Sequence, residues 1–284
     1  MKLKKYLLII TLLFYGIVSC DVIEEPYTKN DETPSESDSN QPNILLEEFT
    51  GHTCIYCPGG SKTAKNLQQQ YPEKIFVVAI HAGGLAAPTD EPYSYDFRTT
   101  EGNEIDGFYG ASTSGLPRGM VNRTLFSNLK TYPASQWGNV VTEFWNKNKI
   151  SQLDIELSAQ CNPSSRTISA NVTLDYFVSQ SKQNKLSVWI LEDNIIQYQK
   201  SIDSPFDIPD YQHNDVLRYS FNGAWGEIVT SSTIPIGFKY SNDYELIVPV
   251  NKDWNLNNLR VIAFVYDDDN GVKQVMDTKV EIVE

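Results

Sequence analysis

The chain has 284 residues, with 23 Lys and Arg against 36 Asp and Glu, and its formal charge of −13 argues against nucleic acid as a partner because like charges repel. Aromatic residues make up 12% and charged residues only 21%, which is typical of a folded globular protein and excludes a coiled coil or a disordered chain. The length predicts two domains.

The first residues have the pattern of an export signal. Three lysines lie within the first five residues, and the apolar stretch 6–18 that follows is shorter than the about 20 residues that span a bilayer. This stretch ends in Ile-Val-Ser-Cys, which resembles a bacterial lipobox. We therefore expect residues 1–19 to be a lipoprotein signal peptide and Cys20 to attach the chain to a membrane through lipid. The alternative is an ordinary signal peptide with a chance cysteine.

Residues 20–42 predict an acidic, flexible tether. Positions 21–41 hold seven acids against one lysine, and too few apolar residues to compensate for the entropy of ordering. The acids that directly follow Cys20 resemble the export signal of surface-displayed lipoproteins, or they are a solvated spacer. The bacterial envelope is the expected location, and the sequence leaves a periplasmic or an outward orientation open.

The first folded segment combines two strands, a cysteine pair and a helix. Residues 44–49 and 75–81 are short apolar runs that predict strands, and between them lie Cys54, Cys57 and a segment with helical spacing of apolar residues. We expect Cys57 to face inward and Cys54 to lie at the exposed helix start, where free N–H groups and the helix dipole stabilise a thiolate. A second thiol one turn away can resolve a mixed disulfide.

This segment resembles the thioredoxin superfamily. Glu48 stands where thioredoxins keep a buried carboxylate that moves protons to and from the inner cysteine, and Leu116-Pro117 matches the cis-proline loop that faces the cysteine pair. The resemblance implies a thiol–disulfide oxidoreductase with Cys54, Cys57, Glu48 and Pro117 as its catalytic groups. Thr53 departs from the family, which has a tryptophan there, and residues 83–110 are an extra loop.

Other roles for the cysteine pair stay open. It is half of a zinc site only if distant groups complete it, since no second pair exists and Cys161 lies far along the chain. It is also compatible with a static disulfide in an oxidising compartment. His52 and His81 are either polar loop residues or proton carriers. We expect neither a metal nor a cofactor.

The apolar period changes near Lys149. Residues 135–147 predict the last helix of a thioredoxin-like α/β domain spanning 43–148, and beyond them apolar and polar residues alternate. The alternation predicts an antiparallel β-sandwich over 149–284, with strands near 153–161, 168–176, 186–190, 216–221, 244–250, 259–266 and 272–282.

Two details of this second segment have simple interpretations. Cys161 falls in phase with the apolar residues of its strand, which predicts a buried free thiol. The run Asp267-Asp-Asp-Asn-Gly271 suggests a calcium loop, but its spacing matches none, and Asn-Gly between alternating strands favours a hairpin.

A polar stretch from Tyr211 to Arg218, followed by Gly223 to Glu227, is explained by no periodicity, and a packed loop is its simplest interpretation. Together with the Glu48-Phe-Thr-Gly-x-x-Cys-x-x-Cys-Pro segment it resembles a family of bacterial outer-membrane lipoproteins known as twenty-eight-kilodalton outer-membrane proteins. That resemblance implies a thioredoxin-like half and a β-sandwich half, and no defined activity.

Two functions therefore remain from sequence. The first is a lipid-anchored thiol–disulfide oxidoreductase that acts on a protein or peptide thiol or disulfide. The second is a non-catalytic surface lipoprotein that binds a ligand or partner and in which the disulfide is structural.

Overall fold

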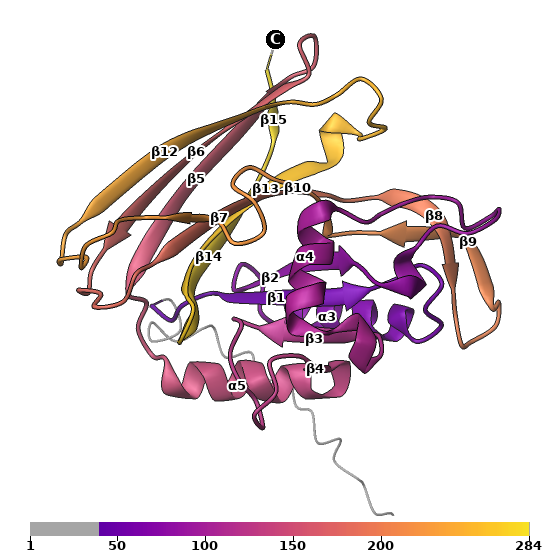
Figure 1. The fold of residues 1–284 in the computed structure, drawn as a ribbon, viewed down its shortest axis with the longest axis horizontal. Helices are drawn as coiled ribbons and strands as arrows, with labels where there is room; N and C mark the ends of the chain where they lie inside the picture. The colour runs from indigo at the N-terminus through magenta and orange to yellow at the C-terminus, as the bar shows by residue number, and fades with distance from the viewer. Residues whose placement is uncertain (1–39, 284) are drawn as a thin grey trace, which may run out of the picture. The chain divides into compact units, whose positions relative to one another are not determined.

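The computed structural model describes residues 40–283 (Figure 1). The expected signal peptide 1–19, Cys20 and the greater part of the expected tether lie outside these residues. The helices are α3 (Cys57–Gln70), α4 (Thr100–Tyr109) and α5 (Trp137–Lys147). The strands are β1 (Ile44–Thr50), β2 (Ile75–His81), β3 (Arg118–Val121), β4 (Tyr132–Pro133), β5 (Leu153–Asn162), β6 (Thr167–Tyr176), β7 (Lys185–Glu192), β8 (Ile195–Lys200), β9 (Asp207–His213), β10 (Val216–Ser220), β11 (Glu227–Ile228), β12 (Lys239–Ile247), β13 (Leu259–Asp267), β14 (Gly271–Lys279) and β15 (Glu281–Ile282).

A nine-stranded mixed sheet forms the centre of the fold, with eight strands in the order β14-β13-β7-β10-β2-β1-β3-β4 and β11 paired to β7. Strand β1 runs parallel to β2, with Ile44 opposite Ile75, and antiparallel to β3. Alternate residues of β1 point to opposite faces of the sheet. Helices α3 and α5 pack on the face of Ile44 and Leu46, and α4 packs on the other face, near Leu45.

A second sheet packs over the far part of the first, giving a sandwich-like arrangement. It has four strands in the order β12-β6-β5-β15, and the inward residues of β5 and β6 share a core with β7 and β13. The alternation of buried and exposed residues along β5 follows the period of two that the sequence shows, because one face of that sheet meets this core and the other meets solvent. The fold is thus a mixed α/β structure with stacked sheets, which confirms the coarser part of the fold prediction.

The nine-stranded sheet crosses the boundary expected between residues 148 and 149. Strand β10 runs parallel to β2, with Val216 opposite Ala79, and the Ala79 N–H donates to the Asp215 carbonyl at 2.7 Å. Contacts place all described residues, 40–283, within one compact unit. The two segments therefore share a sheet.

Three local features refine the expectations from sequence. The segment 83–110, expected as a loop, contains α4, which begins after Thr99 with a side-chain cap to the Gly102 N–H and ends at Gly110 with φ of 65°. Strands β8 and β9, which the sequence did not predict, form a separate two-stranded ribbon that lies at the right of Figure 1. The expected hairpin at 267–271 joins β13 to β14, with Asp267 opposite Gly271.

Candidate functional site

Cys54 and Cys57 form a disulfide between the end of β1 and the start of α3, with their Cα atoms 5.4 Å apart. Helix α3 begins at Cys57, and Pro58 occupies its first turn, where a missing N–H costs nothing. Cys57 faces inward as expected. Cys54, however, is only 2% exposed and precedes the helix, so the expectation of an exposed thiol at the helix start is wrong.

Residues 199–202, at the end of β8 and just beyond it, cover the loop that contains the cysteine pair. The N–H of Lys200 donates to the His52 carbonyl at 2.8 Å, and the N–H of Ile202 donates to the Ile55 carbonyl at 2.8 Å. The side-chain amide of Gln199 donates to the Cys54 carbonyl at 3.0 Å. This added segment lies along the loop between the cysteines and explains why Cys54 is buried.

Glu48 lies on β1, 2% exposed, where the resemblance to thioredoxins places a proton-transferring carboxyl. Burial raises the pKa of Glu48 to about 8, a hydrogen bond from Ser61 lowers it, and the charge of Asp215 raises it. The Ser61 hydroxyl donates to Glu48 Oε1 at 3.0 Å. Near pH 7 the carboxyl is therefore mostly protonated, and it can give up or take a proton within a small pH range.

Pro117 and Glu48 both lie next to Gly60 in α3. A Cβ at Gly60 would come within 2.7 Å of Pro117 Cβ and within 3.1 Å of Glu48 Oε1. The Leu116–Pro117 bond is cis. The structure thus brings Glu48 and Pro117, which lie far apart in sequence, to the first turn after Cys57.

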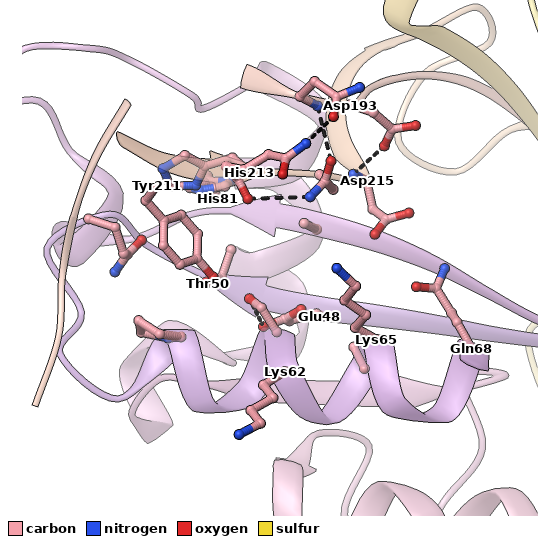
Figure 2. A pocket seen from close by; sticks show the side chains of 18 of the residues that line it. Glu48, Thr50, Lys62, Lys65, Gln68, His81, Asp193, Tyr211, His213 and Asp215 are labelled. Carbon is pink, nitrogen blue, oxygen red and sulfur yellow. Dashed lines mark hydrogen bonds between the residues drawn. The ribbon is translucent and has the colours of Figure 1, made fainter. Parts of the chain in front are cut away.

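A polar cavity of about 710 Å³ opens beside Glu48 and extends to Pro58 and Gln199 (Figure 2). Its walls come from β1 and β2, from helix α3 and from the chain that runs from β9 into β10. The turn between β7 and β8, Gln199 of β8 and Arg260 of β13 complete them. Figure 2 shows these side chains around it: Glu48, Thr50, Lys62, Lys65, Gln68, His81, Asp193, Tyr211, His213 and Asp215. The polar stretch from Tyr211, which sequence left without a role, therefore faces α3 and Glu48.

All three histidines of the chain gather around Phe97. The ring of Phe97 lies 4.4 Å from His81, 4.5 Å from His213 and 5.6 Å from His52, measured between centroids. Both ring nitrogens of His81 and the Nε2 of His213 are buried without a hydrogen-bond partner. Burial lowers the pKa of His213 to about 3 and that of His81 well below its usual range, so these rings are neutral near pH 7.

An arginine surrounded by acids closes the far end of the cavity. Arg260 binds the carboxylates of Asp193, Asp215 and Asp277. Burial raises the pKa of Asp215 to about 6, and the charge of Arg260 opposes that rise. Within residues 40–283, no group of three or more His, Cys, Asp or Glu side chains is placed to hold a metal ion. Cys161 is a buried free thiol, as expected.

A family model described as outer membrane protein Omp28 matches residues 105–283. The chain belongs to the Omp28 family. It is therefore an outer-membrane protein, as expected, and no helix in the described part of the chain is long and apolar enough to cross a bilayer. The matched range includes Pro117 and the wall from Tyr211 to Asp215. It begins after Glu48 and the cysteine pair, so membership of the Omp28 family assigns these three residues no role.

Solved structures resemble the chain at low identity. HBP35 of Porphyromonas gingivalis is 17% identical, with a TM-score of 0.58, and the match covers 85% of this chain and 76% of that one. A domain of the outer membrane lipoprotein Omp28 from Porphyromonas gingivalis is 20% identical, with a TM-score of 0.31 and coverage of 48% and 93%. The first likeness concerns the fold alone. No curated protein matches the chain.

Proposed function

We propose that this chain is a lipid-anchored outer-membrane protein that exchanges thiols and disulfides through Cys54 and Cys57. The observation that carries the proposal is the placement of Glu48 and Pro117 against Gly60, one turn into the helix that begins at Cys57. The order of strand, cysteine pair, helix and parallel strand, followed by Pro117 and an antiparallel strand, supports a thioredoxin-like domain here.

The proposed reaction begins from the reduced protein. The Cys54 thiolate attacks a protein or peptide disulfide, one substrate sulfur leaves and takes a proton from water, and a mixed disulfide forms. Glu48, as a carboxylate, then takes the proton of Cys57, and the Cys57 thiolate attacks Cys54 Sγ. This step restores the Cys54–Cys57 disulfide. The second substrate sulfur leaves as a thiolate and takes the proton from Glu48, so two electrons have passed from the protein to the substrate.

The proposed role of Pro117 is to shape the groove beside the cysteine pair. A proline has no N–H, so the backbone around it leaves groups free to pair with an extended substrate chain. In the oxidised form the segment 199–202 already pairs with residues of the cysteine loop. A substrate would therefore have to displace this segment or reach the sulfurs beside it.

The burial of the disulfide favours a second candidate function, a binding protein with a structural disulfide. Cys54 and Cys57 are 2% and 1% exposed, which protects the bond from attack by external thiols. The cavity beside Glu48 contains neutral imidazoles with unpaired nitrogens, which a polar ligand would satisfy. In this alternative the cysteine pair stabilises the wall of the cavity and is not turned over.

The reduction potential separates the two candidates. The full chain carrying Cys161→Ala, which removes the one other described thiol, is equilibrated with defined thiol–disulfide buffers. An exchanging pair has a potential above about −300 mV, whereas structural disulfides lie below it. In the same background, Cys57→Ser should accumulate mixed disulfides with a peptide substrate and Cys54→Ser should not. A pair that stays oxidised below that potential, with no trapped species, favours the binding protein.

A further inference from the structure

A second cavity, of about 390 Å³, is lined by residues that are distant in sequence from the cysteine pair. The chain after β3, the end of α4 and the turn between β13 and β14 form its walls. It contains three cationic side chains and four aromatic rings, none of which belongs to the proposed exchange site. The proposed thiol–disulfide exchange therefore does not explain why these side chains lie together.

Arg123 lies at the inner wall of this cavity and is 2% exposed. Its Nε and Nη2 bind the two carboxylate oxygens of Glu47 at 2.9 Å and 2.8 Å. The ring of Tyr266 lies 4.6 Å from the guanidinium carbon. The third nitrogen, Nη1, is buried without a hydrogen-bond partner. Leaving a buried donor without an acceptor is unfavourable, so an acceptor within the cavity would stabilise this arrangement.

The backbone holds Arg123 in this position. Asn122 and Arg123 have φ of 49° and 53°, a conformation that side chains with a Cβ rarely adopt. The Leu45 N–H donates to Asn122 Oδ1 at 2.6 Å, and the Val272 N–H donates to the Asn122 carbonyl at 2.8 Å. Strands β1 and β14 thus fix Asn122, the neighbour of Arg123, and Arg123 lines the cavity.

A second cationic side chain lies beside Arg123, which is itself paired with Glu47. Lys130 lines the same cavity, and its ammonium donates to the Arg123 carbonyl at 2.8 Å. It makes no ion pair within the described part of the chain. Burial and the charge of Arg123 lower the pKa of Lys130, whereas the charges of Asp267, Asp268 and Asp269 oppose that shift. Lys185, in contrast, is paired with Asp268 at 2.8 Å.

The outer part of the cavity is apolar. Phe108 is 71% exposed, and its ring meets Trp225 and Tyr109 edge-on at 4.9 Å between centroids. An exposed aromatic cluster at the mouth of a cavity marks a binding surface. Flat rings of this kind pack against the C–H face of a sugar ring, and the exposed carboxylate of Asp268 can accept hydrogen bonds from hydroxyls.

From these features we infer that the cavity binds an acidic sugar, a pyranose that carries a carboxylate or a phosphate. The anionic group binds Arg123 Nη1 and Lys130, which supply charge-assisted donors. The sugar ring packs on Phe108 and Trp225. A bare anion would leave the aromatic wall uncovered, and a neutral sugar would leave Arg123 Nη1 without an acceptor and Lys130 without an ion pair.

The test uses calorimetric titration of the purified full chain at low salt, with glucuronate, glucose 6-phosphate, glucose and inorganic phosphate as probes. We expect the two acidic sugars to bind about tenfold or more tightly than glucose, because a hydrogen bond to a charged group is worth about 1.5–3 kcal/mol. Lys130→Met should remove this advantage. Phe108→Ser, at an exposed position that the fold does not need, should weaken binding of every sugar and leave phosphate unchanged.

Lys182→Met is the matched control, since Lys182 pairs with the neighbouring Asp269 on the surface and does not line the cavity. It should leave binding of all four probes unchanged. The inference is overturned if the acidic sugars bind no more tightly than glucose, if Lys130→Met has no effect, or if inorganic phosphate binds as tightly as the acidic sugars. Near-ultraviolet circular dichroism of each variant confirms that the fold is retained.

Discussion

Gly60 lies so close to Pro117 that a Cβ at residue 60 would come within 2.7 Å of Pro117 Cβ. The same atom would meet Glu48 Oε1 at 3.1 Å. Helix α3 therefore approaches both residues more closely than any side chain at this position permits. The contact links the helix that begins at Cys57 to the two other residues of the proposed exchange site.

Gly60→Ala should lower the free energy of unfolding by about 1–3 kcal/mol, because the added methyl forces the helix away from Pro117. Gly59→Ala is the control. It lies in the same helix with nothing within 4 Å of the new Cβ, so it should be neutral or stabilising by up to about 1 kcal/mol. Urea denaturation of both variants measures the difference. Equal stabilities would show that the approach to Pro117 is not constrained.

The pKa of Glu48 predicts how stability depends on pH. The folded-state pKa of about 8 lies above the ordinary value of 4.5, so the folded protein binds the proton more tightly than the unfolded chain. The contribution of this group is therefore present in full below about pH 4.5 and is lost as the pH rises towards 8, by at most about 1.4 kcal/mol per pH unit.

Glu48→Gln, which cannot titrate, provides the reference for this measurement. The unfolding free energy of the wild type minus that of the variant should fall between pH 5 and pH 8 and then level off. A difference that stays constant over this range would place the pKa of Glu48 near its ordinary value and remove the basis for its role in proton transfer.

Gln199 should control access to the disulfide. Its amide donates to the carbonyls of Cys54 and Gly51, so Gln199→Ala loosens the segment that covers the cysteine loop. We expect dithiothreitol to reduce the disulfide several times faster in this variant. Gln197→Ala, on the same strand, is the control and should react like the wild type. Equal rates in all three proteins would show that segment 199–202 does not limit attack on the sulfurs.

Lipid attachment at Cys20 remains a prediction, because residues 1–39 lie outside the described structure. The mature protein extracted from the envelope should lack residues 1–19 and carry an acyl adduct, as judged by its intact mass. Cys20→Ala should release the protein from the membrane without changing its melting temperature, because residue 20 precedes the first strand at Ile44. An unmodified Cys20 in the mature chain would contradict the lipobox interpretation.

The division between 43–148 and 149–284 also remains a prediction. Trp189 and Phe264 of the second segment are fully buried in a core that includes Leu45 and Phe49 of the first. Expressed alone, residues 149–284 would expose these rings, so we expect binding of a hydrophobic dye and a tendency to aggregate. Analytical ultracentrifugation measures whether this fragment is monomeric or aggregated. A monomeric, dye-free β-rich fragment would establish that the second segment folds as a separate domain.

Local pattern predicted the elements whose burial follows a simple period. The alternation along 153–161 produced β5 because one face of that strand meets a core, and Asn270-Gly271 produced the hairpin because its turn requires a positive φ, observed at Gly271 as 79°. The strand, cysteine pair and helix were likewise predicted, since a short apolar run and helical spacing are properties of consecutive residues.

The tertiary structure alone decided which of these elements meet. Strands β8 and β9 escaped prediction because they are a half-exposed ribbon with no apolar face, and it is this ribbon that buries Cys54. His213 lies in a stretch that stood out in the sequence without a role, and Arg123 carries no local signal. The first lines the cavity beside Glu48, and the second binds Glu47, 76 residues away. The period of the apolar residues along a segment indicates which of its faces is buried. It does not identify the distant partner that buries the segment, so the two cavities became visible only in the folded chain.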